Sequence, residues 1–151
     1  MDTCKIAPGI YQYTAIDDCT RYQVIEIYPA RTAANTILFL EKVVEEMRFP
    51  IQSIQTDHGT EFFAYKVQEW LGQYCIKFRT IRPGQPHLNG KVERVQQTDL
   101  KESWALADLY DNHLSDRLSE YQHYCNWDRV HGSTGKTPMD KVVELNRQTP
   151  F

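Results

Sequence analysis

The chain lacks any long hydrophobic run, and no stretch approaches the roughly 18 apolar residues that a membrane-spanning helix needs. Its first residues, Met1 to Lys5, lack the basic-then-apolar pattern of a signal peptide. It has no internal repeat and no low-complexity segment. These absences argue against membrane and exported classes of protein and favour a cytoplasmic protein with no membrane partner.

Cysteine is scarce and scattered. The four cysteines, Cys4, Cys19, Cys75 and Cys125, form no C-x-x-C pair. This spacing argues against a disulfide framework and against a zinc site, and it predicts reduced, partly buried thiols.

The chain also lacks an excess of positive charge. Seventeen Lys and Arg stand against 20 Asp and Glu, which gives a net charge of −3. A dedicated nucleic-acid-binding domain usually has a pI above about 9. Any action on nucleic acid is therefore expected to be local, through a metal site or with help from other modules. The length of 151 residues and the hydrophobic fraction of 41% indicate one ordinary globular domain.

Aromatic and β-branched residues are concentrated in two runs, 10–16 and 22–28. The polar turn 17–21 separates them, which predicts an antiparallel pair of strands. Residues 2–6 are expected to add a third strand, with Pro8-Gly9 as its turn.

The periodicity then becomes helical. Apolar residues recur at steps of three and four after Thr32, a plausible N-cap, and the inward face is predicted to hold Ala33, Ile37, Leu40, Val44 and Met47. A strand at 51–56, a helix at 60–74 and a strand at 75–81 should follow. The inward residues of that second helix are expected to be Phe63, Val67, Trp70 and Tyr74. The strand–helix–strand order implies a right-handed crossover and a parallel pair.

The last part of the chain reads as helical after a loop at 82–90, which is rich in Pro and Gly. One helix is expected to run from this loop to about Leu109, and another over 115–127. Thr137 and Pro138 predict the start of a short last helix at about 138–146. The pattern as a whole predicts an α/β fold with a mixed sheet.

Three acids have positions suited to chemistry. Asp57 directly follows the strand 51–56, at the kind of strand end where α/β proteins build their sites. Glu93 falls in the first turn of the helix after the loop, and Asp2 opens the first strand. Each acid alone is more simply a turn former. The 35 residues between Asp57 and Glu93 change the interpretation of the set.

Two segments around these acids, TDHGTEF at 56–62 and NGKVER at 89–94, carry a resemblance. They resemble the catalytic core of the retroviral integrase and insertion-sequence transposase superfamily, whose active site is Asp, Asp and Glu with 35 residues between the last two. The resemblance covers essentially the whole chain. Its other motifs are Asp2-Thr3, IDDCTR at 16–21 with Thr for the usual Ser, PHLNG at 86–90, NWDRVH at 126–131 with Val130 for the usual Pro, and Thr137-Pro138.

The resemblance implies a ribonuclease-H-like fold, with a five-stranded mixed sheet flanked by helices over residues 1–151. It implies a bacterial insertion-sequence transposase or integrase, a metal-dependent polynucleotidyl transferase that acts in transposition and DNA recombination. We expect this core to be part of a longer protein with an upstream end-recognising domain. Two rival functions stay open: a related nuclease that only hydrolyses, and an inactive, domesticated DNA-bridging module.

In this family Asp2 and Asp57 would hold one metal ion, and Asp2 with Glu93 a second. Mg²⁺ is the expected ion, with Mn²⁺ able to substitute. Three carboxylates that converge without a cation would repel one another, so the set makes sense as a cation site. Two ions stabilise charge on both the attacking and the leaving oxygen of phosphodiester transfer.

The expected partners are DNA, as transposon ends and target, and further copies of the chain. Lys91, Arg94 and Lys101 lie on or near the helix of Glu93 and are candidates for phosphate contacts, with a solvated helix face as the alternative. Asn89 and Gly90 are expected to shape the helix entry and to allow close approach of DNA. Arg21 is expected to anchor its turn. A homodimer or higher assembly is expected, in which the helical region 92–127 could self-associate through Trp104, Tyr110 and Tyr124.

Overall fold

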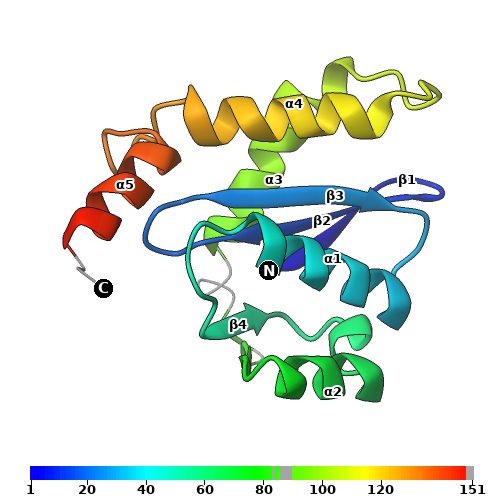
Figure 1. The fold of residues 1–151 in the computed structure, drawn as a ribbon. Helices are drawn as coiled ribbons and strands as arrows, with labels where there is room; N and C mark the ends of the chain where they lie inside the picture. The colour runs from blue at the N-terminus through cyan, green and yellow to red at the C-terminus, as the bar shows by residue number, and fades with distance from the viewer. Residues whose placement is uncertain (83, 86–89, 149–151) are drawn as a thin grey trace.

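The computed structural model describes residues 1–82, 84, 85 and 90–148. Its first three strands, β1 (Asp2–Ala7), β2 (Ile10–Ile16) and β3 (Gln23–Tyr28), form an antiparallel sheet in chain order (Figure 1). The meander predicted from the sequence is confirmed. Its register sets Asp2 opposite Thr14, and Thr14 opposite Ile25.

A second, parallel ladder joins β4 (Ser53–Thr56) to β5 (Lys77–Thr80), as the crossover pattern predicted. The single five-stranded mixed sheet is not what the described residues show, because their strands pair as two separate ladders. The ladders meet at Met1, whose amino group donates a hydrogen bond of 2.7 Å to the carbonyl of Gln55.

Helices cover both faces of the three-stranded sheet (Figure 1). On one face lies α1 (Ala33–Glu46), and beyond it lie β4 and α2 (Tyr65–Gln73). On the other face lie α3 (Gly90–Glu102) and α4 (Leu114–Trp127), followed by α5 (Pro138–Gln148) at one end. Two 3₁₀ turns, Thr60–Phe62 and Trp104–Leu106, complete the list of helical segments in the described chain.

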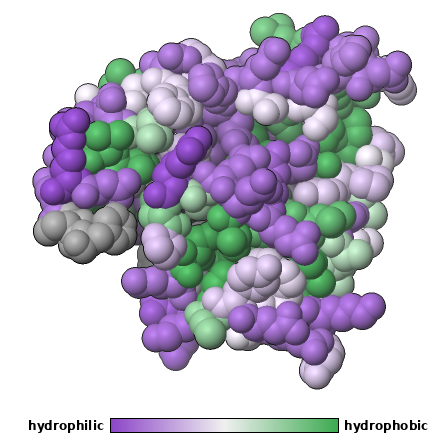
Figure 2. Space-filling view, in the orientation of Figure 1, coloured by the Kyte–Doolittle hydropathy of each residue, from purple (hydrophilic) through white to green (hydrophobic). Residues whose placement is uncertain are grey.

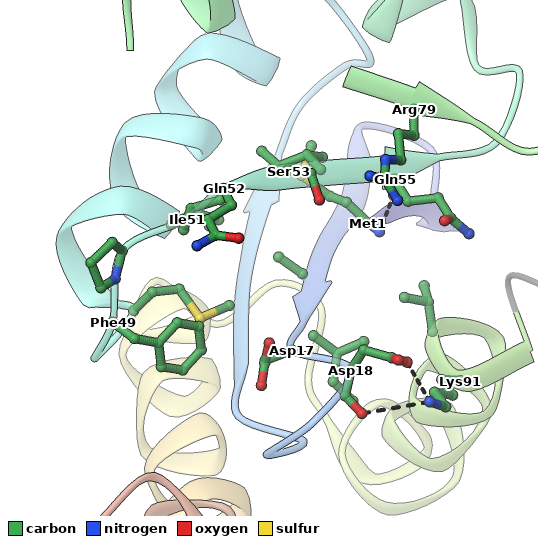
Figure 3. Close-up of a pocket in the computed structure, with 17 residues that line it drawn as sticks. Met1, Asp17, Asp18, Phe49, Ile51, Gln52, Ser53, Gln55, Arg79 and Lys91 are labelled. Carbon is green, nitrogen blue, oxygen red and sulfur yellow. Dashed lines mark hydrogen bonds and ion pairs between the residues drawn. The ribbon is translucent and has the colours of Figure 1, made fainter. Parts of the chain in front are cut away.

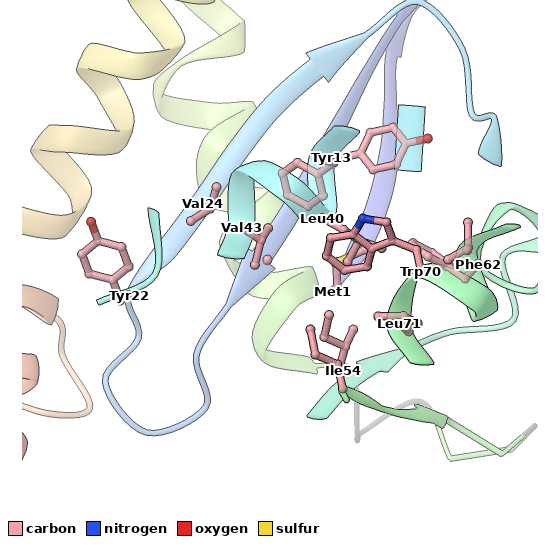
Figure 4. Close-up of a cluster of buried hydrophobic side chains, with 14 of the residues drawn as sticks. Met1, Tyr13, Tyr22, Val24, Leu40, Val43, Ile54, Phe62, Trp70 and Leu71 are labelled. Atoms are coloured by element: carbon pink, nitrogen blue, oxygen red, sulfur yellow. The ribbon is translucent and has the colours of Figure 1, made fainter. Parts of the chain in front are cut away.

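The main hydrophobic core fills the space between the sheet, α1 and α2 (Figure 4). Alternate residues of the strands, such as Tyr13 and Val24, point into it and meet Leu40 and Val43 of α1. A smaller cluster on the opposite face packs α4 on β3 through Ile25, Trp104, Leu114 and Leu118. The sheet is thus buried on both faces.

Helix α1 begins where predicted, because the Thr32 side chain accepts a hydrogen bond from the Asn35 N–H. Its predicted inward face is largely confirmed, because Leu40 is buried and Ala33, Ile37 and Met47 pack partly buried against the core. Val44 is the exception at 36% exposed, and Thr36, Phe39 and Val43 are buried in addition. Thr36 can be buried because its hydroxyl donates to the carbonyl of Thr32. The start of α5 is also confirmed, since the Thr137 hydroxyl accepts from the Asp140 N–H at 3.1 Å.

The predicted helix 60–74 is wrong in its first five residues and is confirmed over Tyr65–Gln73, where Val67 and Trp70 are buried as expected. Ala64 adopts an extended conformation, with φ −57° and ψ 137°, so the chain makes a 3₁₀ turn before α2 begins. Phe63 is consequently 45% exposed and stacks on His58 instead of pointing inward. Tyr74, just beyond α2, is also exposed and stacks on Trp70.

The helix predicted to reach Leu109 ends at Glu102. The chain then turns so that Trp104 is buried and its indole N–H donates to the side-chain oxygen of Gln12. Trp104 is therefore a core residue and lies outside any surface for self-association. Tyr110 and Tyr124 are exposed.

The four cysteines are free thiols, as predicted, although Cys19 and Cys75 are exposed rather than partly buried. Within the described part of the chain, no helix is both long and apolar enough to cross a membrane.

Helix α4 covers the outer edge of β3 by hydrogen bonding as a neighbouring strand would. The Gln122 side chain accepts from the Ile25 N–H at 2.8 Å. One turn later Asn126 accepts from the Gln23 N–H at 2.9 Å and donates to the Gln23 carbonyl at 2.7 Å. Backbone groups at a sheet edge must find partners when they are buried. The family tail motif at 126–131 therefore starts with a residue that has a structural task.

We predict that Asn126→Ala lowers the free energy of unfolding by about 2–4 kcal/mol, because it leaves two buried backbone groups of Gln23 without partners. Urea denaturation followed by circular dichroism measures the loss. The same substitution at the exposed Asn146 of α5 is the control and should change stability by no more than about 0.5 kcal/mol. Equal effects at both positions would show that the edge contact contributes nothing.

Candidate active site

Asp2 stands at the start of β1 and is almost fully buried. Its Oδ1 accepts a hydrogen bond of 2.8 Å from the Thr3 N–H. Burial and, to a smaller extent, the negative charges of Asp57 and Glu93 together raise the pKa of Asp2 to about 6. The three predicted acids therefore lie close enough for their charges to interact.

Asp57 follows β4 directly, and its Oδ1 accepts from the Gly59 N–H at 3.1 Å. Gly59 has a steric reason to be glycine, because a Cβ there would lie 2.9 Å from a carboxylate oxygen of Glu61. Glu61 is buried and accepts a hydrogen bond of 2.8 Å from the Thr3 hydroxyl. The loop of Asp57 is thereby tied to the strand of Asp2.

Glu61 is a site residue that was not predicted from the sequence. The pattern that could have marked it is the spacing of Asp57, Gly59 and Glu61, in which a glycine leaves room for the acid two positions later. A buried carboxylate in a hydrogen bond to the residue beside Asp2 indicates a positioning role.

Glu93 is the fourth residue of α3 and is exposed. Its helix is fastened to the sheet by a buried polar cluster. The Gln12 side chain donates to Asp99 Oδ2 at 2.7 Å and to the Thr14 hydroxyl at 2.9 Å, and accepts from the Trp104 indole. This cluster fixes where α3 runs and hence where Glu93 lies. Unlike Glu61, Gln12 has no local sequence pattern that marks it.

The charges of Asp57 and Glu93 act on Asp2, but the three carboxylates do not converge into a closed metal site. Among the residues described, no three His, Cys, Asp or Glu side chains are grouped so that they could hold a metal ion. The donor set itself suits a hard cation, because all three groups are carboxylates. The raised pKa of Asp2 fits such a site, since burial and the neighbouring acids disfavour its negative charge.

The candidate DNA-contacting residues are spread along α3. Lys91 forms an ion pair with Asp18, in the turn between β2 and β3, and Arg94 is exposed beside Glu93. Lys101 is exposed in the last turn of the helix, about 15 Å along its axis from Lys91. Gly90 is the first helical residue. Asn89 and most of the predicted loop 82–90 lie outside the described residues.

A hollow of about 640 Å³ opens between β4 and the turn after β2 (Figure 3). None of the three acids lines it, although Met1 and Val92, which precede Asp2 and Glu93 in the sequence, do. Met1, Gln55 and Arg79 lie at one end, and Asp18 with Lys91 at the other. Its inner wall is apolar and includes Val43, Met47, Phe49, Ile51 and Ile54. Figure 2 shows hydrophobic residues gathered in the middle of this side of the molecule, while the surface over α4 is mainly hydrophilic.

The chain resembles integrase core domains over most of its length. A family model described as Integrase core domain matches residues 1–86, and a second one with the same description matches residues 64–138. The matches together include Asp2, Asp57 and Glu93.

The chain is 27% identical over 159 aligned residues to a protein of Spiroplasma virus SpV1-C74 named "Putative integrase ORF3". That alignment covers 93% of this chain and 41% of the relative, so the chain spans about two fifths of the relative's length. The structure of the present chain is similar to that of the catalytic core domain of BIV integrase. The TM-score is 0.77, and the identity is 21% over 97% of this chain and 95% of the other. This similarity shows a shared fold, the ribonuclease-H-like fold of integrase cores.

The buried Asp99 makes stability depend on pH. Burial raises its pKa to about 6, above the value of 3.8 of a free side chain, so the folded state holds the proton more tightly than the unfolded state. The wild type should therefore gain stability as pH falls from 7 through 6 to about 4, whereas Asp99→Asn cannot gain in this way. We predict that the stability of the variant relative to wild type falls by about 2 kcal/mol over this range.

Urea denaturation at pH 7, 6, 5 and 4 measures this difference. Asp128→Asn is the control, because Asp128 is exposed to water at the end of α4. Its difference from wild type should stay nearly constant. A constant difference for Asp99→Asn as well would contradict a buried carboxyl group that prefers its protonated form.

Proposed function

Because the chain belongs to the integrase core domain family, we propose that it catalyses Mg²⁺-dependent cleavage of DNA at the ends of a mobile element, followed by transfer of the cleaved strand to target DNA. Integrase core domains act in DNA integration. The observation that carries the finer proposal is the coupling of Asp2 to the charges of Asp57 and Glu93, three acids supplied by three separate elements.

The three carboxylates would hold two Mg²⁺ ions, one between Asp2 and Asp57 and one between Asp2 and Glu93, with Mn²⁺ able to substitute. When bound, the ions would stabilise negative charge on the attacking and leaving oxygens of the phosphodiester. The buried position of Asp2 supports this assignment, because a carboxylate beside two others in a poorly solvated place is favoured when positive charge is close.

Other residues of the chain hold the acids in position. Thr3 and Glu61 hold the loop of Asp57 against β1, and Gln12 with Asp99 holds the helix of Glu93 against the same sheet. Catalysis of a two-substrate transfer gains most from fixed placement of its reacting groups. Both links run through β1 and its neighbour β2, so a shift of either strand would misplace more than one acid.

The kind of mobile element and the cell in which it acts belong to the same proposal. The tail motif at 126–131 supports a bacterial insertion-sequence transposase that acts in the cytoplasm. We expect residues 1–151 to be the catalytic core domain of a longer protein, because the matched relative is more than twice as long as the aligned region. Two element ends have to be cut and joined, so a dimer or higher assembly on DNA is proposed for the active state.

We predict that Glu93→Gln lowers strand transfer by at least a hundredfold, because the amide keeps the shape of the side chain but removes a negative charge from the cation site. Stability should stay equal or rise slightly, since repulsion among the acids is relieved. Gel assays of strand transfer and a melting curve on the same sample measure both effects. Glu120→Gln, on the exposed side of α4, is the matched control and should leave both unchanged.

The assay also separates the rival functions. A pre-cleaved element end incubated with a target plasmid yields a joined product with a transferase, and only shortened DNA with a nuclease. An inactive bridging module gives neither product with Mg²⁺ or Mn²⁺. Full strand transfer by Glu93→Gln would contradict the assignment of Glu93 as a ligand.

A further inference from the structure

Three residues from sequence motifs that had no assigned function meet at one place. Arg21 comes from the turn motif 16–21, and Arg129 and His131 come from the tail motif 126–131. They line a second hollow, of about 660 Å³, on the side of α3 that bears Arg94 and Thr98. Segments more than 100 residues apart in the sequence therefore build one concave surface beside the helix that carries Glu93.

The lining of this hollow is positively charged in a domain whose net charge is −3. Among the described residues that line it, four are permanent cations, and the one carboxyl group is the buried Asp99. The four cations are Arg21, Lys91, Arg94 and Arg129. Because the net charge of the domain is negative, a local concentration of cations marks a place where a polyanion can bind.

The lowered pKa of His131 is consistent with the same positive potential. Its pKa is lowered by burial first, and then by the positive charges of Arg21, Arg129 and Arg94. An imidazole whose protonation is opposed by three guanidinium groups stands in a place that favours anions.

Two of the guanidinium groups are held in place, and one is free to bind. Arg21 donates to the carbonyl of Asp18, and Arg129 forms an ion pair of 2.6 Å with Glu102. Arg94 is exposed and takes part in none of the ion pairs found among the described residues. A guanidinium group presents a planar fork of donors that matches the oxygens of a phosphate.

We propose that this hollow binds a backbone phosphate of the DNA strand that is cut at the three acids, with Arg94 as the direct contact and Arg21 and Arg129 as the fixed positive wall. The proposal rests on the proposed function, because Arg94 follows Glu93 in the sequence and points to a neighbouring face of the same helix. A strand whose scissile phosphate lies at Glu93 would place an adjacent phosphate at the hollow.

The test is equilibrium binding of a fluorescent DNA duplex, measured by anisotropy in EDTA so that no cleavage occurs. Arg94→Gln should weaken binding about tenfold at low salt and reduce the slope of log K against log salt by about 0.9, the value for one lost phosphate contact. Arg94→Lys should restore the slope but only part of the affinity, since it keeps the charge without the fork.

Arg147→Gln is the control, because Arg147 is an exposed arginine of α5 that lies outside the lining of the hollow. It should bind as the wild type does. Arg94→Gln with the affinity and salt slope of Arg147→Gln would overturn the proposal. A 5′-mononucleotide that binds the wild type as tightly as the duplex would also overturn it, because the hollow would then be a nucleotide site.

The outcome is separable from that of the proposed function. Wild-type protein that cleaves and joins DNA, with Arg94 irrelevant to binding, would remove the hollow and leave the catalytic assignment standing. Wild-type protein that binds DNA through Arg94, yet neither cleaves nor joins it with Mg²⁺, would remove the catalytic assignment and leave the hollow.

Discussion

The buried amide of Gln12 connects the two halves of the candidate site. It is 1% exposed, and both ends of its side chain are used: the nitrogen donates to Asp99 and Thr14, and the oxygen accepts from Trp104. Buried polar groups of this kind are costly unless they are paired, so the cluster accepts one arrangement of α3 on the sheet. Because Thr14 is also the register partner of Asp2, the same contact relates the helix of Glu93 to the strand of Asp2.

A second connection works from the other side of β1. The hydrogen bond from Thr3 to Glu61 holds the short turn after Asp57, and the lack of a side chain at Gly59 makes room for it. Asp2 and Thr3 are neighbours in a strand, so their side chains point to opposite faces of the sheet. One end of β1 therefore presents a carboxylate on one face of the sheet and an anchoring hydroxyl on the other. The raised pKa of Asp2 is the consequence of its burial first and of the neighbouring acids second.

The parts of the fold that depend on local pattern could be predicted from the sequence. The aromatic and β-branched residues of 10–16 and 22–28, with the polar turn between them, predicted the meander, and Thr32 and Thr137 predicted two helix starts. The break at Ala64 could not be predicted, because it serves the packing of Glu61 against a strand almost 60 residues earlier.

The same reason explains what was missed in and around the site. Asp57 and Glu93 stand out by their spacing, whereas Gln12 and Asp99 gain their meaning only from a hydrogen bond between residues 87 positions apart. Arg21 was expected to anchor its turn, and it does so through the carbonyl of Asp18. Its place in the wall of the basic hollow follows from the packing of the tail on α3, which no local pattern encodes.

The acids from β1, the end of β4 and α3 are proposed to form one cation site. Anomalous diffraction from crystals of the protein grown with Mn²⁺ would locate the bound ions. We expect two anomalous peaks roughly 3.5–4 Å apart, bounded by the carboxylates of Asp2, Asp57 and Glu93. Well-ordered Mn²⁺ bound by other side chains, with these three carboxylates free of metal, would contradict it.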